Sequence, residues 1–298
     1  MTTSPLTAPT DPLEAPTGAP TAIVTGGSSG IGRALAEALS ATGLTVVVAD
    51  RQVRLAESVV AGIRMRGGHA RVAELDVRDP RQFAEIVTTT FDATGRLDYL
   101  FNNAGIGVVG EMCYYGPSDW SDVLDVNLAG VCNGIAAAYP RMVRQRFGHI
   151  VNTASVAGLV PTPMIGSYTA SKFAVVGLSR ALRLEAKRHG IRVSVVCPAI
   201  VDTPLLRGGH YSRVNDDAEP LREHARKLHV WASDPDTIAR RVLRAVALNR
   251  AVIVEPPWAR GLWYLDRLSP WATEQLCGRL LSRVLPVSRA AVSSREPQ

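Results

Sequence analysis

A tyrosine and a lysine four positions apart are the residues whose types and spacing most suggest chemistry. Tyr168 and Lys172 fall in a stretch with helical spacing, so their side chains are expected on one face of a helix. A phenol with the ordinary pKa of about 10 is a poor base at neutral pH, but a nearby ammonium stabilises the phenolate. We therefore expect Lys172 to lower the pKa of Tyr168 and the pair to transfer a proton.

Two other polar residues could complete this centre. Ser155 ends an expected strand thirteen residues before Tyr168 and could donate a hydrogen bond to a substrate oxygen as charge develops there. Asn127 lies within a long helical stretch, where its amide could replace a backbone hydrogen bond and hold a water that relays protons from Lys172. A tyrosine and a lysine at this spacing also occur by chance, so the pair gains meaning only beside a nucleotide site.

A glycine-rich segment near the start of the sequence indicates such a site. Thr25–Gly32 directly follows an apolar run and opens a helical pattern. Glycines let the backbone turn tightly and approach a pyrophosphate, and the free amides at a helix start attract its charge. The alternative is a tight turn without a ligand. The residues expected at a dinucleotide here are Gly26, Ser28, Ser29, Gly30, Ile31 and Gly32.

Asp50 and Arg51 bear on which dinucleotide binds. Asp50 ends the second apolar run about 20 residues after the loop, where a carboxylate can accept hydrogen bonds from ribose hydroxyls and repel a 2′-phosphate. Arg51 could instead pair with that phosphate. NAD is therefore the favoured cofactor, and NADP stays open. Asp50 could also be the N-cap of the next helix, and the two roles are compatible.

Later parts of the chain supply further cofactor contacts. Asp76 and Val77 follow the third run and could flank the adenine, while Asn102–Gly105 closes the fourth run. Small residues and amides there could hold the strand end open beside the cofactor, or the chain could simply turn. Lysine is a compact charge that can reach a ribose hydroxyl. The contacts expected from these positions are Asn103, Ala104, Gly105, Tyr168 and Lys172.

The elements that must position these residues follow from hydrophobic periodicity. Short runs rich in Val and Ile alternate with helical patterns, as in βαβ units. The expected strands are Ala22–Thr25, Thr45–Ala49, Ala70–Leu75, Leu97–Phe101, His149–Asn152, Arg192–Cys197 and Ala251–Val254. The expected helices are Ile31–Ser40, Leu55–Met65, Arg81–Thr90, Trp120–Arg146 and Tyr168–Arg188. We predict a single α/β domain with a doubly wound, seven-stranded parallel sheet, a Rossmann fold with ligands at the carboxyl ends of the strands.

Composition limits the domain organisation and the partners. One domain over residues 21–255 follows a Thr-, Pro- and Ala-rich tail, residues 1–20, that we expect to be disordered. The net charge of +6 is scattered without a Lys/Arg run, so no nucleic-acid partner is expected. The four cysteines are far apart, which argues against a zinc site and disulfides and favours a reduced, cytoplasmic protein.

Two segments are expected to select the substrate. Residues 204–234 could form a lid over the substrate or an ordinary surface excursion; they include Gly208, Gly209, His210 and Tyr211, followed by Leu221, Ala225 and Leu228 in a helical pattern. The opposite wall is expected to be apolar, which favours a small hydrophobic alcohol or carbonyl substrate over a sugar. The residues of this wall are Val156, Val160, Pro161, Pro163, Met164 and Ile165.

Residues 256–298 are an expected amphipathic C-terminal extension. Tryptophan, leucine and arginine residues recur there at helical spacing, and Ser269-Pro270 has the composition of a helix start. No apolar run reaches the ~20 residues that span a bilayer. Three interpretations stay open: packing on the domain or a partner subunit, contribution to an apolar substrate site, and peripheral membrane contact.

Taken together and in their order, the motifs resemble the short-chain dehydrogenase/reductase family over roughly Thr21 to Val254. The resemblance rests on Thr25–Gly32, Asn102–Gly105, Asn127, Ser155 and the Tyr168/Lys172 pair. It implies a tetrad of Ser155, Tyr168, Lys172 and Asn127, direct hydride transfer at nicotinamide C4, no metal, and a homo-oligomer, dimer or tetramer.

One departure from the family's pattern follows the sixth run. Family members usually carry Pro-Gly there, whereas Pro198 is followed by Ala199, which resists the positive φ that glycine tolerates and could alter the turn under the nicotinamide. Ile200 and Thr203 still resemble the family's backbone and hydroxyl contacts to the carboxamide. Pro198, Ile200 and Thr203 are thus expected cofactor contacts.

The sequence favours an NAD-dependent alcohol dehydrogenase that acts on a hydrophobic secondary alcohol. A rival hypothesis is an NADPH-dependent ketoreductase, which Arg51 would support. A third is a nucleotide-sensing binding protein that uses the fold without catalysis, and the intact Tyr168/Lys172 pair counts against it.

Overall fold

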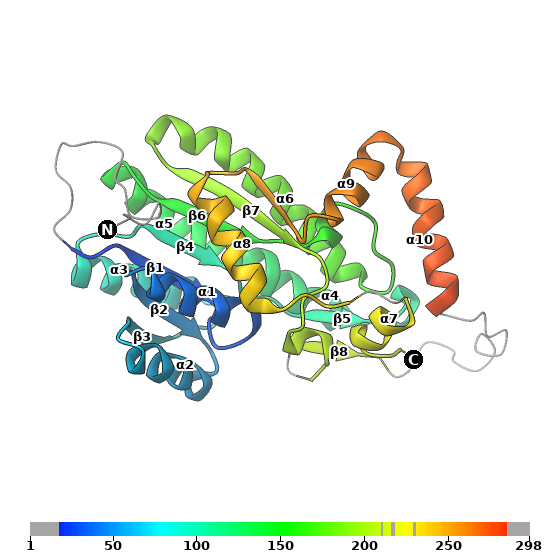
Figure 1. Ribbon diagram of the computed structural model, residues 1–298, viewed down its shortest axis with the longest axis horizontal. Helices are drawn as coiled ribbons and strands as arrows, with labels where there is room; N and C mark the ends of the chain where they lie inside the picture. The colour runs from blue at the N-terminus through cyan, green and yellow to red at the C-terminus, as the bar shows by residue number, and fades with distance from the viewer. Residues whose placement is uncertain (1–17, 210, 216–217, 229–230, 285–298) are drawn as a thin grey trace.

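Seven parallel strands form the central sheet of the molecule (Figure 1). A computed structural model describes residues 18–209, 211–215, 218–228 and 231–284. The strands run in the order β3-β2-β1-β4-β6-β7-β9, and neighbours pair in parallel. Their bounds are β1 Thr21–Thr25, β2 Thr45–Asp50, β3 His69–Glu74, β4 Tyr99–Asn102, β6 His149–Thr153, β7 Arg192–Pro198 and β9 Val252–Glu255. The predicted doubly wound, seven-stranded parallel sheet is confirmed.

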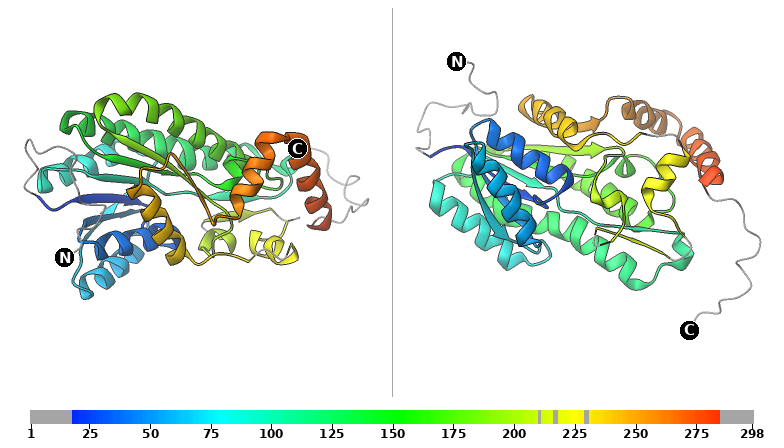
Figure 2. Two further views of the ribbon diagram at one scale, coloured as in Figure 1. Left: turned by 45° about the horizontal axis from the view of Figure 1, so that its top comes forward. Right: turned by 60° about the horizontal axis from the view of Figure 1, so that its bottom comes forward.

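Helices cover both faces of this sheet (Figure 2). One face carries α1 (Gly30–Ala41), α2 (Val53–Met65) and α8 (Pro235–Ala247). The other carries α3 (Pro80–Thr94), α5 (Gly130–Gln145) and α6 (Gly166–Ala186). Strand β2 shows why both faces are covered, because Val46 and Val48 point into one core, Val47 points into the other, and none of the three is exposed.

The five predicted helices are present, and one helix was missed. The stretch predicted at 120–146 consists of α4 (Pro117–Leu124), a π-helical turn (Asp125–Ala129) and α5. Helix α8 was not predicted, although its start has the residues of a helix N-terminus: the Asp234 carboxylate accepts from the Thr237 N–H at 2.8 Å, and proline follows it. Short 3₁₀ turns lie at Met112–Tyr114, Val156–Gly158, Lys187–His189 and Pro204–Leu206.

A second, two-stranded sheet was also missed. Strands β5 (Gly107–Val109) and β8 (Ser212–Val214) pair in parallel and join the chain after β4 to the expected lid. The lid further contains α7 (Leu221–Lys227), and its His210 lies outside the described residues. Strands of three residues are too short for a periodic pattern to be recognised in the sequence.

The described residues reach slightly into the expected N-terminal tail. The backbone carbonyl of Gly18 accepts from Arg96 at 3.2 Å, and that of Pro20 accepts from the Thr45 N–H at 2.9 Å. Residues 18–20 are therefore part of the fold, which corrects the expected boundary at residue 21. The rest of the expected tail, residues 1–17, lies outside the described residues.

The C-terminal extension forms two helices, α9 (Ala259–Leu268) and α10 (Pro270–Val284). The predicted helix start at Ser269 is confirmed, because its hydroxyl accepts from the Ala272 N–H at 3.3 Å. Residues 285–298 lie outside the described residues. Within the part of the chain that the structure describes, no helix combines the length and the apolar character needed to cross a bilayer.

Candidate active site

Tyr168 and Lys172 lie on one face of α6, as their spacing predicts. The Lys172 ammonium lies 5.3 Å from the centroid of the Tyr168 ring and donates to the backbone carbonyl of Thr153 at 2.9 Å. Only 2% of Lys172 is exposed. The end of β6 and the first turns of α6 therefore hold the ammonium in one place beside the phenol.

Burial dominates the acidity of both groups. It raises the pKa of Tyr168 to about 12, although a hydrogen bond from Ser155 acts in the opposite direction. It lowers the pKa of Lys172 to about 8. The expectation that Lys172 lowers the pKa of the phenol is therefore wrong for the protein without a ligand. The physical reason is that removing the phenolate from water raises the pKa, and burial is the largest influence on this phenol.

Ser155 lies where β6 ends, next to the end of β7. Its hydroxyl donates to the backbone carbonyl of Pro198 at 3.3 Å and accepts from the Ala157 N–H at 3.1 Å. The proximity of Ser155 to Tyr168 partly offsets the rise in the pKa of the phenol. The serine hydroxyl thus has a fixed position beside the phenolic oxygen.

Asn127 lies in the π-helical turn and is fully buried. Its side chain accepts from the Ile106 N–H at 2.9 Å and donates to the Ile106 carbonyl at 3.0 Å and to the Ser171 hydroxyl at 3.1 Å. The helix widens into a π-helical turn at Asn127, but the amide bonds to Ile106 and Ser171 and not to the backbone of its own helix, so the predicted replacement of a helix hydrogen bond is not seen. Ser171, which sequence reasoning missed, ties the amide to α6. The relay water expected at Asn127 stays a prediction.

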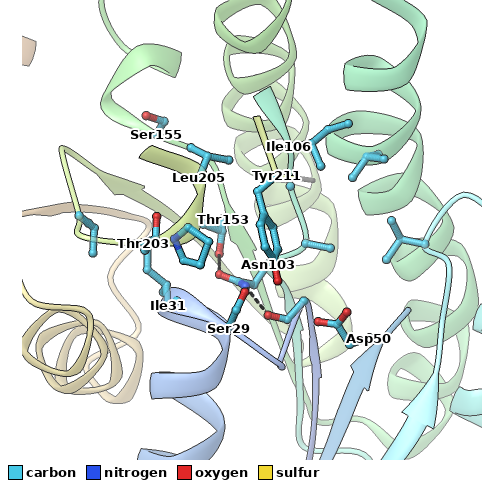
Figure 3. A pocket seen from close by; sticks show the side chains of 18 of the residues that line it. Ser29, Ile31, Asp50, Asn103, Ile106, Thr153, Ser155, Thr203, Leu205 and Tyr211 are labelled. Carbon is cyan, nitrogen blue, oxygen red and sulfur yellow. Dashed lines mark hydrogen bonds between the residues drawn. The ribbon is translucent and has the colours of Figure 1, made fainter. Parts of the chain in front are cut away.

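A groove along the carboxyl ends of the strands joins the catalytic and cofactor candidates (Figure 3). Of the predicted residues, its lining includes Gly26, Ser29, Gly30, Ile31, Asp50, Arg51, Asp76, Val77, Asn103, Ala104, Gly105, Ser155, Tyr168, Lys172, Pro198 and Thr203. Ser28, Gly32, Asn127 and Ile200 are not among the lining residues. The structure therefore brings two distant groups of predicted residues into one groove.

The glycine-rich loop fits the backbone approach that a pyrophosphate requires. Gly26 and Gly30 have φ values of 63° and 51°, in the left-handed region that favours glycine. A Cβ on Gly32 would lie 2.1 Å from the Gly26 carbonyl oxygen, so only glycine fits there. No side chain caps the start of α1 and no acidic residue lies in its first turn, which leaves the helix N-terminus open to an anion.

Asp50 organises this loop from the end of β2. Its carboxylate accepts from the Ser28 N–H at 3.1 Å and from the Gln52 N–H at 2.9 Å. The alternative that Asp50 is the N-cap of α2 is wrong, because Gln52 holds that position. Arg51, beside it, is exposed and lines the same groove.

Asn103 connects three strand ends. Its side chain donates to the Thr25 carbonyl at 3.2 Å and accepts from the Thr153 hydroxyl at 3.3 Å, while its N–H donates to the Thr25 hydroxyl at 3.0 Å. Thr153, and the bonds of Thr25 to Asn103, were missed, because nothing in their own segments marks them as partners of a distant amide. Asp76 is paired with Arg78, whose guanidinium holds the pKa of that carboxyl below its usual value.

The turn after β7 accommodates alanine. The Ala199 N–H donates to the Glu255 carbonyl at 2.8 Å, and Ala199 is not among the non-glycine residues with positive φ. Ala199 therefore fits this turn without a positive φ, so the alanine does not force the turn to change. The Ile200 carbonyl accepts from the Ser233 N–H at 2.9 Å. Ile200, an expected cofactor contact, does not line the groove, and the neighbouring Val201 does.

A lid residue closes one side of the groove. The Gln52 side chain donates to the Tyr211 hydroxyl at 2.6 Å, across 159 positions of sequence. Figure 3 shows the Tyr211 ring projecting into the pocket toward the end of β2, where Asp50 lies. Tyr211 was expected in the lid, but its partner Gln52 was missed, because no local pattern links the two.

The expectation of an apolar wall lining the substrate side of the groove is wrong. None of its six residues is among the lining residues. Val160 is buried in the core cluster that contains Val175 and Val195, and Ile165 packs in a smaller cluster against which Tyr168 and Leu221 lie. The wall thus supports the reaction centre from outside, and Ile106 and Leu205 supply apolar lining within the groove. No group of three His, Cys, Asp or Glu side chains suited to a metal occurs among the described residues.

Comparison with known proteins agrees with this fold and these motifs. Residues 20–210 match the short chain dehydrogenase family. The 2,5-dichloro-2,5-cyclohexadiene-1,4-diol dehydrogenase of Sphingobium indicum is 38% identical over 211 residues, 70% of this chain and 81% of that protein.

Two solved structures are also similar. A short-chain dehydrogenase/reductase from Burkholderia phymatum in complex with NAD has a TM-score of 0.75 and 30% identity, over 86% of this chain and 95% of that one. A metagenomic short-chain oxidoreductase in complex with NADP has a TM-score of 0.64 and 32% identity, over 78% and 94%. The doubly wound sheet has the Rossmann architecture, and the family match identifies the chain as an oxidoreductase. The chain belongs to the short-chain dehydrogenase/reductase family.

Proposed function

We propose that this protein transfers a hydride between a nicotinamide dinucleotide and a hydrophobic secondary alcohol or the corresponding ketone, with Tyr168 as the proton-transfer group. The observation that carries the proposal is the meeting of Tyr168, Ser155 and Lys172 in the groove that also contains the glycine-rich loop and Asp50. The similar structures with NAD and NADP support a nicotinamide cofactor.

NAD is the cofactor that we favour. The glycine-rich loop would hold the pyrophosphate, and Asp50 would accept from the ribose hydroxyls while it keeps its bonds to Ser28 and Gln52. A 2′-phosphate would meet the same carboxylate, which opposes NADP, although Arg51 could compensate. When bound, the nicotinamide ring accepts or donates the hydride at C4.

The protein's own groups move the proton. With a pKa of about 12, Tyr168 keeps its proton at neutral pH, which suits it to donate to a ketone oxygen during reduction. In alcohol oxidation the phenolate takes the hydroxyl proton, with Lys172 supplying positive charge beside it. Ser155 would donate to the substrate oxygen, anchored by Ala157.

Lys172 and Asn127 would have different tasks. An ammonium has three donors, and one of them is taken by the Thr153 carbonyl, which leaves two for a ribose hydroxyl and the phenol. Asn127 would position the chain around Ile106 and complete the proton exit through a water. This assignment completes the tetrad that the family resemblance implies.

The apolar surroundings support a hydrophobic substrate. Ile106 and Leu205 line the groove, and the Sphingobium relative is named for a dehydrogenase of a cyclic diol. We therefore expect activity in a panel of steroids, terpenoid alcohols, aliphatic alcohols and their ketones, followed through the absorbance of the reduced nicotinamide. Turnover only of sugars would contradict this choice.

Tyr168→Phe tests the proposal. Removing the proton-transfer group should lower kcat by about 10² to 10⁴, with NADH affinity close to that of the unchanged protein. Tyr264→Phe, on an exposed part of α9, is the matched control and should retain full activity. Substantial turnover by Tyr168→Phe would overturn the role of the phenol.

Two rival functions give different results in the same assays. Tighter binding and faster turnover with NADPH would identify an NADPH-dependent ketoreductase, with Arg51 as the expected 2′-phosphate ligand. Binding of NAD(H) without turnover of any compound in the panel would indicate a nucleotide-sensing protein. The intact Tyr168/Lys172 geometry favours catalysis over sensing.

The assembly and the cellular location stay predictions. We expect a homodimer or homotetramer, as the family resemblance implies, and a cytoplasmic protein. Analytical ultracentrifugation over a range of concentrations would give the mass in solution, and a concentration-independent monomer would contradict the expected assembly.

A further inference from the structure

Exposed apolar side chains occur along the two C-terminal helices and directly before the first of them. Trp258, Tyr264, Leu268 and Trp271 are exposed, with 86% of Leu268 and 70% of Trp271 accessible to solvent. Leu268 ends α9 and Trp271 lies in the first turn of α10, so these two flank the corner between the helices. Figure 1 shows this corner standing clear of the sheet at one end of the molecule. We call these four residues the apolar strip.

Residues next to the strip on both helices pack against the rest of the domain. Ala259 is fully buried, and Leu262 and Trp263 pack against a core cluster that includes strands β7 and β9. On α10, Thr273 is fully buried and the Cys277 thiol donates to the Pro161 carbonyl at 3.3 Å. The inward faces of both helices are therefore already used in packing. The four side chains of the strip remain exposed in the part of the chain that the structure describes.

Basic side chains accompany the strip. Between residues 256 and 284 the sequence has four arginines and two acidic residues, Asp266 and Glu274. Arg267, Arg279 and Arg283 form no ion pair with any described residue, whereas Arg260 lies 3.4 Å from the Glu255 carboxylate. The Arg267 guanidinium lies 5.8 Å from the centroid of the Trp263 ring. Over residues 256–284 the two helices therefore carry exposed apolar side chains together with a net positive charge, and Arg279 and Arg283 lie farther along α10 than the corner.

We propose that α9 and α10 dock this protein on the surface of an anionic lipid bilayer. Tryptophan and tyrosine rings are favoured at the headgroup level, a protruding leucine reaches the acyl chains, and arginines attract lipid phosphates. A second copy of the chain fits less well, because a symmetric contact between two such surfaces would bring unpaired arginines together. The docking is peripheral, since no described helix can span a membrane.

Vesicle sedimentation of the full chain tests this proposal without any measurement of activity. We expect binding to vesicles of phosphatidylcholine with phosphatidylglycerol, weak binding to phosphatidylcholine alone, and release at high salt. Leu268→Ser with Trp271→Ser should lower the partition coefficient about tenfold or more. The matched control is Leu184→Ser with Trp231→Ser, which are 79% and 90% exposed elsewhere. It should change the coefficient less than about twofold, because these positions do not meet the bilayer.

A charge series separates local docking from attraction by the net charge of +6. Arg279→Gln with Arg283→Gln on α10 should weaken binding by about fivefold for each arginine, which corresponds to about 1 kcal/mol per charge near a membrane surface. Arg240→Gln with Arg244→Gln on the exposed face of α8 removes the same charge and should have a much smaller effect. Unchanged melting temperatures and NADH binding would establish that all variants are folded.

Three results would overturn the proposal. The unchanged protein could fail to sediment with anionic vesicles, or the strip variant and its control could lose binding equally. The strip variant could also abolish a dimer while vesicles bind neither protein, which would assign the strip to a second copy of the chain.

Discussion

The cofactor loop and the lid border the same groove but are held in place by different kinds of contact. On the cofactor side, the backbone determines the geometry. The Ser28 N–H donates to the Asp50 carboxylate, and Gly26 and Gly30 adopt left-handed φ values. On the lid side, side chains far apart in sequence meet, as in the bond from Gln52 to Tyr211 and the ion pairs of Arg213 with α4. Local sequence therefore defines the first side, and tertiary contacts define the second.

Different responses to mutation follow from this difference. A change on the cofactor side meets backbone that cannot move aside, whereas a change in the lid removes one side-chain contact from a segment held by two three-residue strands. We expect large, all-or-none losses on the cofactor side and graded changes in rates on the lid side.

The largest effect is expected from Gly32→Ala. The new Cβ would lie 2.1 Å from the Gly26 carbonyl oxygen, so the loop must shift. We expect NADH affinity to fall roughly 100-fold or more, since misplacement by about 1 Å can have that effect. Fluorescence titration measures it. Gly177→Ala, where a Cβ meets no atom within 4 Å, is the control and should bind normally. Normal binding by Gly32→Ala would contradict the backbone account.

Asn127→Leu tests the hydrogen bonds that connect the cofactor side and the lid side of the groove. It leaves the N–H and carbonyl of Ile106 and the hydroxyl of Ser171 without their amide partner in a buried place. We expect the free energy of unfolding to fall by about 2–4 kcal/mol, measured by urea denaturation. Asn133→Leu, which removes one bond to the Val77 carbonyl, should lower it by about 1 kcal/mol. Equal losses of unfolding free energy in the two variants would show that Asn127 contributes no more to stability than Asn133 does.

His149 gives the sheet an acid sensitivity that should exceed that of the lid. Burial, with the charges of Arg192 and Arg183, lowers the pKa of His149 to about 3. The imidazole is therefore neutral in the folded protein but takes up a proton near pH 6.5 when unfolded. Stability from this residue is complete above pH 6.5 and is lost as the pH falls toward 3, by at most about 1.4 kcal/mol per pH unit.

Urea denaturation between pH 7 and 5 measures this sensitivity. His149→Gln should flatten the dependence on pH in that window, because the linked proton is gone. His224→Gln in α7, where burial also lowers the pKa of the histidine, is the comparison from the lid and should flatten it less, since that imidazole is less deeply enclosed. A stronger effect of His224→Gln would reverse the expected ranking of the two regions.

The smallest effect is expected from Tyr211→Phe, which removes only the bond from Gln52. One hydrogen bond typically contributes about 1 kcal/mol, so NADH should dissociate roughly three- to tenfold faster while the melting temperature stays nearly constant. Stopped-flow fluorescence measures the rate. Gln52→Leu should act alike, and combining both changes should add little, because they break the same bond. Additive effects would mean that the two residues act separately.

The same division explains what the sequence could predict. The glycine-rich loop, Asp50 and the Tyr168/Lys172 pair carry their geometry in local spacing, and the structure places them along one groove. The bond between Thr25 and Asn103 and the role of Ser171 escaped notice, because they depend on partners far away in sequence. The pKa of Tyr168 was expected to move in the wrong direction, because burial is a property of the whole fold and cannot be read from a four-residue spacing.

A structure of the protein crystallised with NADH is the most direct test of the central claim, that the phenol and the ammonium meet beside a bound nicotinamide. We predict that the ring occupies the groove with its C4 next to the Tyr168 hydroxyl and that the Lys172 ammonium reaches the adjoining ribose while it keeps its bond to Thr153. A nicotinamide bound away from both side chains would contradict the account.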